Sequence, residues 1–125
     1  MDLPKKERTF GFSYVSDESG LTYDGTFTVK CKLNVAEKYQ LELEKSRLMS
    51  DMANPSNGLM GIAIALSTLR VRIVDGPNWW TQGKGLNIED EDVLVALFER
   101  VETECMEWRK ELSERAAKAR EELGK

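Results

Sequence analysis

Apolar and polar residues alternate along two runs near the start of the chain. The residues that share the apolar side are Phe10, Phe12 and Tyr14 in the first run and Phe27, Val29, Cys31 and Leu33 in the second. A period of two is that of a β-strand with one buried face. The polar, turn-forming residues 16–20 separate the runs, so the pattern predicts a β-hairpin over about residues 9–33. Gly25, inside the second run, predicts a local bulge.

The segment that follows the hairpin predicts a first helix over about residues 35–53. Asn34 can cap its first turn, and Glu37 stands three residues later, as in a capping box. The apolar stripe is irregular: Val35, Tyr39 and Leu43 recur every four residues, whereas Leu41, Leu48 and Met52 lie off that stripe. The pair Asn54-Pro55 ends this helix, because the residue before a proline is disfavoured in the α conformation.

Two further helices are predicted, over about residues 57–74 and 89–123, with a loop between them. The apolar residues of the first recur in steps of three and four and are Leu59, Ile62, Leu66, Leu69 and Ile73. Its β-branched end, residues 71–74, is compatible with a helix or a strand. The core stripe of the last helix is Leu94, Phe98, Val101, Cys105, Trp108 and Leu112. The whole pattern predicts a mainly helical α+β fold, a hairpin followed by about three helices, in one domain that spans residues 1–125.

Composition narrows the classes of function. The chain has 125 residues, a net charge of −4 and no histidine. The negative charge argues against a protein that neutralises nucleic-acid phosphates. The missing histidine excludes serine-histidine and cysteine-histidine catalysis and imidazole metal sites. We therefore expect an interaction protein rather than an enzyme.

The N-terminus and the apolar runs contain no targeting signal that we identify. Residues 1–8 are polar and precede no apolar segment of a secretory signal, and the longest mainly apolar run, residues 59–69, is too short to span a bilayer. The two cysteines, Cys31 and Cys105, fall on apolar faces, which predicts buried thiols, with a disulfide between them as the alternative. We expect a cytoplasmic protein without a membrane partner.

No motif predicts a catalytic, cofactor or metal site. Gly83-Lys84 lacks the glycine spacing and the following hydroxyl residue of a phosphate-binding loop. The acidic residues 89–92 could hold a divalent cation, but at a helix start they are better explained by favourable interaction with the helix dipole. The last 37 residues carry a net charge of −5 and the preceding residues +1. A nucleic-acid mimic or acidic inhibitor is therefore one alternative, and a solvated helix face is the preferred interpretation.

Two adjacent tryptophans, Trp79 and Trp80, are the most informative pair in the chain. They could close the core at a helix end, or they could anchor a protein partner, because tryptophan is enriched at the energetic centres of interfaces. The irregular first helix and several methionines could likewise form an adaptable contact surface. These methionines are Met49, Met52, Met60 and Met106.

Parts of the sequence resemble the tail assembly chaperones of long-tailed, siphovirus-like bacteriophages. Residues 58–80 are rich in small residues and end in Val74-Asp75-Gly76-Pro77-Asn78-Trp79-Trp80, which is similar to a V-D-x-P-x-W-W element of that family. Residues 85–94 resemble the G-L-x-x-x-D-x-x-V opening of the family's last helix, and residues 107–109 fit its later turns. Residues 10–12 and 25–30 are similar to its N-terminal hairpin. The middle region, residues 35–54, has no matching signature.

The resemblance implies a non-enzymatic, phage-encoded protein of the host bacterial cytoplasm that is absent from the mature virion. It would bind the tape measure protein, keep it soluble and help recruit the tail tube protein, as a homo-oligomer and without a cofactor. The resemblance implies partner-binding residues at only three positions of this chain, Pro77, Trp79 and Trp80. The alternatives are a structural phage assembly adaptor and a small acidic inhibitor or regulator.

Overall fold

The computed structural model describes residues 6–50 and 57–124. Its elements, in order, are β1 (Glu7–Val15), β2 (Thr22–Lys30), α1 (Val35–Met49), α2 (Asn57–Arg72), β3 (Ile73–Asp75), α3 (Asn78–Thr81) and α4 (Glu91–Leu123). The three strands form one antiparallel sheet in the order β1-β2-β3. The α+β class and the hairpin followed by helices are confirmed, and β3 and α3 are additions to the predicted set.

The hairpin is regular throughout the pairing of β1 with β2. Phe10 lies opposite Phe27, and Phe12 lies opposite Gly25 without any break in register. The predicted bulge at Gly25 is therefore wrong, and the one irregularity lies between Thr28 and Val29, where β2 pairs with β3. Gly25 serves a different purpose: a Cβ atom there would lie only 2.6 Å from the side chain of Pro77.

The second predicted helix ends earlier than expected. Residues 73–75 form β3, because the β-branched Ile73 and Val74 suit the edge of the sheet next to β2. The predicted loop after it contains the single helical turn α3, which begins after Pro77. The first helix is capped as predicted, with Asn34 accepting from the Glu37 amide at 2.8 Å and Glu37 accepting from the Asn34 amide at 3.0 Å. Its predicted end, including Met52 and the Asn54-Pro55 stop, lies outside the described residues.

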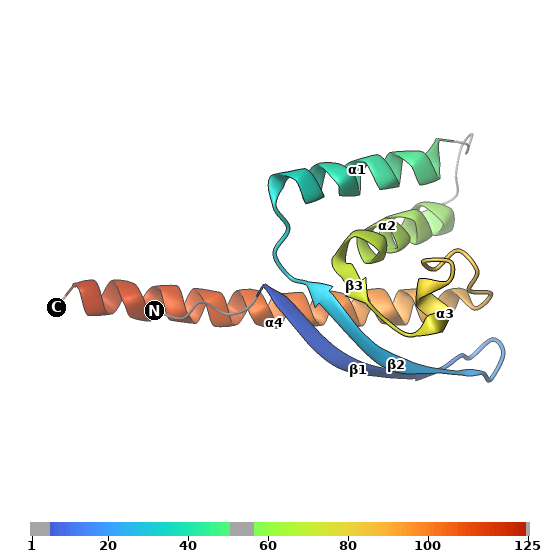
Figure 1. Cartoon of the computed structure of the whole chain (residues 1–125), viewed down its shortest axis with the longest axis horizontal. Helices are drawn as coiled ribbons and strands as arrows, with labels where there is room; N and C mark the ends of the chain where they lie inside the picture. Colours follow the sequence, from blue (N-terminus) through green and yellow to red (C-terminus); the bar gives the residue numbers. More distant parts are fainter. Residues whose placement is uncertain (1–5, 51–56, 125) are drawn as a thin grey trace.

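One core joins the sheet to α2, α3 and α4. Its fully buried members include Phe27 and Val29 of β2, Leu69 of α2 and Leu97 and Val101 of α4. Figure 1 shows α1 on the outer side of α2, farthest from the hairpin. Helix α1 contributes no buried side chain to this core.

Helix α4 is much longer than the core that it covers. Its last buried residue is Trp108, whereas the helix continues to Leu123 and extends beyond the other elements (Figure 1). Within the described ranges, no helix combines the length and the apolar composition needed to cross a bilayer. Both cysteines, Cys31 at the end of β2 and Cys105 on α4, are buried free thiols, as predicted.

Two arginines attach the ends of the hairpin to the helices. Arg8 of β1 forms ion pairs with three glutamates of α4, and the distances are 3.1 Å to Glu104, 3.6 Å to Glu107 and 3.4 Å to Glu111. Arg72, at the end of α2, donates through Nη1 to the backbone carbonyls of residues 30 and 31 at 2.8 and 3.1 Å. These contacts determine how α2 and α4 lie relative to the sheet.

We predict that Gly85→Ala destabilises the protein by about 2–4 kcal/mol. Gly85 has a φ of +92°, and an added Cβ would lie 2.5 Å from Leu66 and 2.7 Å from Trp80. Urea unfolding measures the change. Gly11→Ala is the control, because nothing lies within 4 Å of its added Cβ. Equal stability of the two variants would contradict the close packing of residue 85.

Candidate functional site

The predicted partner-binding residues lie where α3 meets the hairpin. Trp80 points inward and is only 3% exposed, as part of the core. Gly85 leaves room for it, because an added Cβ atom there would lie 2.7 Å from its ring. Trp80 therefore closes the core at a helix end. This was one of the two interpretations of the tryptophan pair, the other being an anchor for a partner.

Trp79 is half-buried and lies against the aromatic side of the hairpin. Its ring centroid is 5.3 Å from that of Tyr23, 5.5 Å from that of Phe27 and 6.3 Å from that of Phe12. Its Nε1 donates to the backbone carbonyl of Asp24 at 2.8 Å. Trp79 thus holds α3 to β2, as does Pro77 by its close approach to Gly25. Both side chains retain some exposed surface, so contact with a partner stays a prediction.

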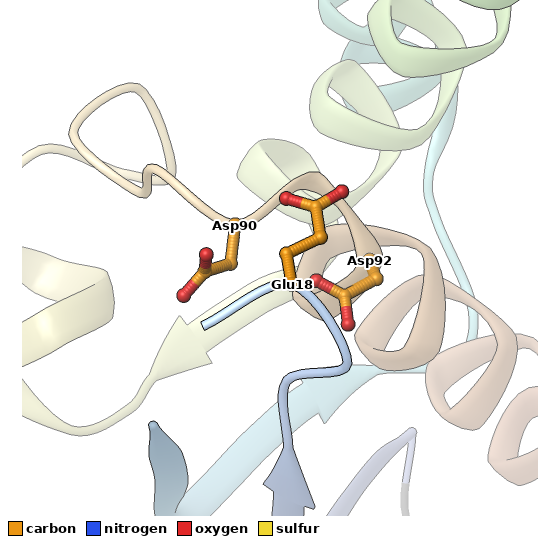
Figure 2. Close-up of side chains that lie close together, drawn as sticks. All are labelled: Glu18, Asp90 and Asp92. Atoms are coloured by element: carbon orange, nitrogen blue, oxygen red, sulfur yellow. The ribbon is translucent and has the colours of Figure 1, made fainter. Parts of the chain in front are cut away.

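Three carboxylates gather where the hairpin turn meets the start of α4. Glu18 comes from the turn, Asp90 precedes α4 and Asp92 lies in its first turn, and Figure 2 shows the three side chains close together. One oxygen from each lies within 4.8 Å of the others. We call Glu18, Asp90 and Asp92 the acidic cluster.

Hydrogen bonds from the hairpin already engage two members of the acidic cluster. Asp90, which is almost fully buried, accepts from the hydroxyls of Ser19 and Tyr23, each at 2.7 Å. Asp92 accepts from Tyr14 at 3.0 Å, from Ser16 at 2.9 Å and from the amide of residue 17 at 2.8 Å. From the sequence, the preferred explanation of the acidic residues 89–92 was their favourable interaction with the helix dipole. The structure adds a second role, which is to attach the turn of the hairpin to α4.

The environment shifts the pKa values of this cluster in opposite directions. Desolvation and the neighbouring charges of Asp92 and Asp90 raise the pKa of Glu18. Desolvation also acts to raise the pKa of Asp92, but the hydrogen bonds from residues 14, 16 and 17 outweigh it and lower the pKa. The hydrogen bond to Asp90 raises the pKa of Tyr23 to about 12. Glu18 is thus the member whose charge is least favourable.

The acidic cluster could offer oxygen ligands to a hard divalent cation such as calcium. Binding would have to compete with the five hydrogen bonds named above, which already satisfy Asp90 and Asp92. The contacts therefore fit a structural attachment better than a metal centre. Nor does Cys31 resemble a nucleophile, because a hydrogen bond with Cys105 and burial raise its pKa.

A separate surface lies on α1 and is apolar but exposed. Val35, Tyr39 and Leu43 are 83%, 68% and 53% exposed. They recur every four residues and share one side of the helix, which we call the outer stripe. Leu41 and Leu48, which lie off this stripe, are half-buried and face the rest of the protein. The irregular sequence pattern thus reflects a helix with apolar residues on two sides.

We predict that the two tryptophans contribute to stability without any partner. Trp80→Ala should lower the free energy of unfolding by about 3–5 kcal/mol, because it empties a core position. Trp79→Phe should cost about 0.5–1.5 kcal/mol, because it keeps a ring but removes the hydrogen bond to Asp24. Urea unfolding followed by circular dichroism measures both changes. Wild-type stability in both variants would mean that the pair serves a partner only.

We also predict opposite effects of neutralising Glu18 and Asp92. A raised folded pKa means that charged Glu18 opposes folding, so Glu18→Gln should be more stable than wild type at pH 7. That difference should vanish below the ordinary pKa of about 4.5. A lowered folded pKa means that charged Asp92 favours folding, so Asp92→Asn should be less stable at pH 7. Its deficit should shrink as the pH falls below about 3.8.

Thermal unfolding between pH 3 and pH 8, a range that spans roughly both carboxyl values, tests these signs. Glu114→Gln is the matched control, because Glu114 is exposed on the far part of α4, away from the acidic cluster. A destabilised Glu18→Gln variant at pH 7 would contradict the repulsion assigned to the cluster.

Comparison with known proteins gives no family assignment for this chain. No protein-family model, curated protein or solved structure matches it.

Proposed function

We propose that this protein is a tail assembly chaperone of a long-tailed bacteriophage. It binds the tape measure protein in the host cytoplasm, keeps it soluble, helps recruit tail tube subunits and leaves before the tail is complete. It performs no catalysis. The sequence resemblance of residues 58–94 motivates the proposal, and one structural observation supports it, which is the exposed outer stripe of α1.

An exposed apolar stripe on a helix is suited to covering another helix. Side chains four residues apart on α1 would pack against apolar residues of equal spacing on the partner, as in helical recognition generally. Val35, Tyr39 and Leu43 already lie in a helix that is capped at its first turn, so little backbone ordering is needed on binding. Single exposed apolar residues are common, but these three share one side of a helix, and contiguous exposed apolar surface is typical of interaction sites.

Helix α1 is also the element best placed to contact a partner without disturbing the core. It has no buried side chain and packs on the outer side of α2 (Figure 1). Pro77 and Trp79 offer a second, smaller contact region on the hairpin side. Trp80 is buried and would act only by supporting the α3 turn from within.

The test is co-expression with the tape measure protein of the phage that encodes this chain. We predict that wild type keeps the tape measure protein soluble and that both elute as one complex in size-exclusion chromatography with light scattering. The double variant Tyr39→Ser/Leu43→Ser should reduce the soluble tape measure protein at least about tenfold, because it removes two apolar anchors. Its own thermal stability should remain that of wild type, since both side chains are exposed.

The matched control is Ala36→Ser/Gln40→Ser, two exposed and uncharged positions of the same helix outside the outer stripe. This variant should solubilise the tape measure protein as wild type does. A wild-type protein that leaves the tape measure protein insoluble would overturn the proposal. If the two double variants keep equal amounts of tape measure protein soluble, the outer stripe is not the surface that binds it.

A further inference from the structure

A cavity of about 450 Å³ lies between α1 and the middle of α4, on the opposite side of α1 from the outer stripe. Its apolar wall includes Leu41 of α1 and Trp108 and Leu112 of α4. This volume is about that of one turn of helix, so the cavity can receive a few side chains but not a whole helix. Any helical partner would therefore lie across its mouth.

Positive charge surrounds this cavity. Lys32, Lys38, Arg72 and Arg109 line it, and among the described residues no carboxylate does. This concentration stands out in a chain whose net charge is −4. The neighbouring cavity of about 550 Å³ differs, because its lining includes Glu7 and Glu37 beside the lysines, and Glu37 pairs with a lysine there.

Arg72 has a donor that the described part of the protein does not use. Its Nη1 holds two backbone carbonyls, whereas its Nε is buried and has no hydrogen-bond partner among the described residues. A buried donor favours an acceptor, and a carboxylate suits the planar guanidinium best. The cavity thus combines an apolar wall, a half-buried arginine whose Nε is buried, and a basic rim.

We propose that this cavity is a docking site for an acidic amphipathic helix of a protein partner. Apolar side chains of that helix would enter against Trp108 and Leu112, and its carboxylates would pair with Lys38, Arg109 and Arg72. The proposal rests on the proposed function in one respect, that the partner is helical. The charge and shape of the cavity supply the rest.

The test uses a synthetic helical peptide as the probe. The acidic peptide has 20 residues and capped ends, with leucines at heptad positions a and d and glutamates at the flanking positions. Two control peptides carry lysine or glutamine in place of each glutamate. Fluorescence anisotropy of labelled peptide with the full chain measures Kd. We expect the acidic peptide to bind, the glutamine peptide to bind at least about tenfold more weakly and the lysine peptide not to bind. Binding of the acidic peptide should weaken as salt rises.

Charge reversal on the rim locates the site. Lys38→Glu and Arg109→Glu should each weaken binding of the acidic peptide at least about tenfold. Lys110→Glu is the matched control, because it adds the same charge change one residue along α4 at a position that does not line the cavity. All three side chains are exposed, so the variants should fold as wild type does, and thermal unfolding verifies this.

Arg72 supplies an independent readout. Its side-chain Nε–H signal in nitrogen-edited NMR spectra should shift when the acidic peptide saturates the protein. An unchanged signal, equal affinity for acidic and lysine peptides, or equal effects of Arg109→Glu and Lys110→Glu would each overturn the proposal. The Tyr39→Ser/Leu43→Ser variant distinguishes the docking site from the proposed function. That variant should no longer keep the tape measure protein soluble, but it should bind the acidic peptide as wild type does.

Discussion

The burial of one aromatic ring, that of Phe27, is the contact on which the arrangement of the other elements depends. A two-stranded hairpin is marginal in water unless its apolar face is covered. Phe27 is fully buried at the centre of that face and lies within 6 Å of the rings of Phe10, Phe12 and Trp79. Gly76 approaches the same ring so closely that an added Cβ would lie 2.9 Å from it. The path of the chain from β3 into α3 therefore follows from covering Phe27.

Polar contacts then orient α4 across the sheet at two separated points. Near the turn of the hairpin, Asp90 and Asp92 accept hydrogen bonds from tyrosine and serine hydroxyls. At the other end of the hairpin, Arg8 pairs with glutamates of α4. Core packing already resists sliding of α4 along its axis. Hydrogen bonds and ion pairs add directional contacts, which the hydrophobic effect does not supply. The two attachments help to fix its position, and they use five of the chain's 22 acidic residues.

Helix α1 is the long element that has no buried side chain among the described residues. Its half-buried leucines, Leu41 and Leu48, face α2 and the cavity, whereas Val35, Tyr39 and Leu43 are exposed to solvent. The proposed chaperone function uses the outer stripe, and the proposed acidic-helix site uses the cavity behind the same helix. Since α1 adds little to the core, the outer stripe can vary without loss of the fold.

Local patterns in the sequence determined the elements whose signals are local. Alternation along residues 9–33 determined the hairpin, and the capping box at Asn34 determined the start of α1. The spacing from Leu94 to Leu112 predicted only part of the buried face of α4, because Phe98 and Leu112 are half-buried and the buried Val93 and Leu97 lie outside that stripe. Tertiary structure decided the rest. Ile73 and Val74 lie in a strand because β3 pairs with the edge of β2 that β1 leaves unpaired. Gly25 remains in register opposite Phe12, and its lack of a side chain leaves space for Pro77. The acidic cluster and the basic cavity join residues distant in sequence, whose proximity depends on packing, so no local pattern could reveal them.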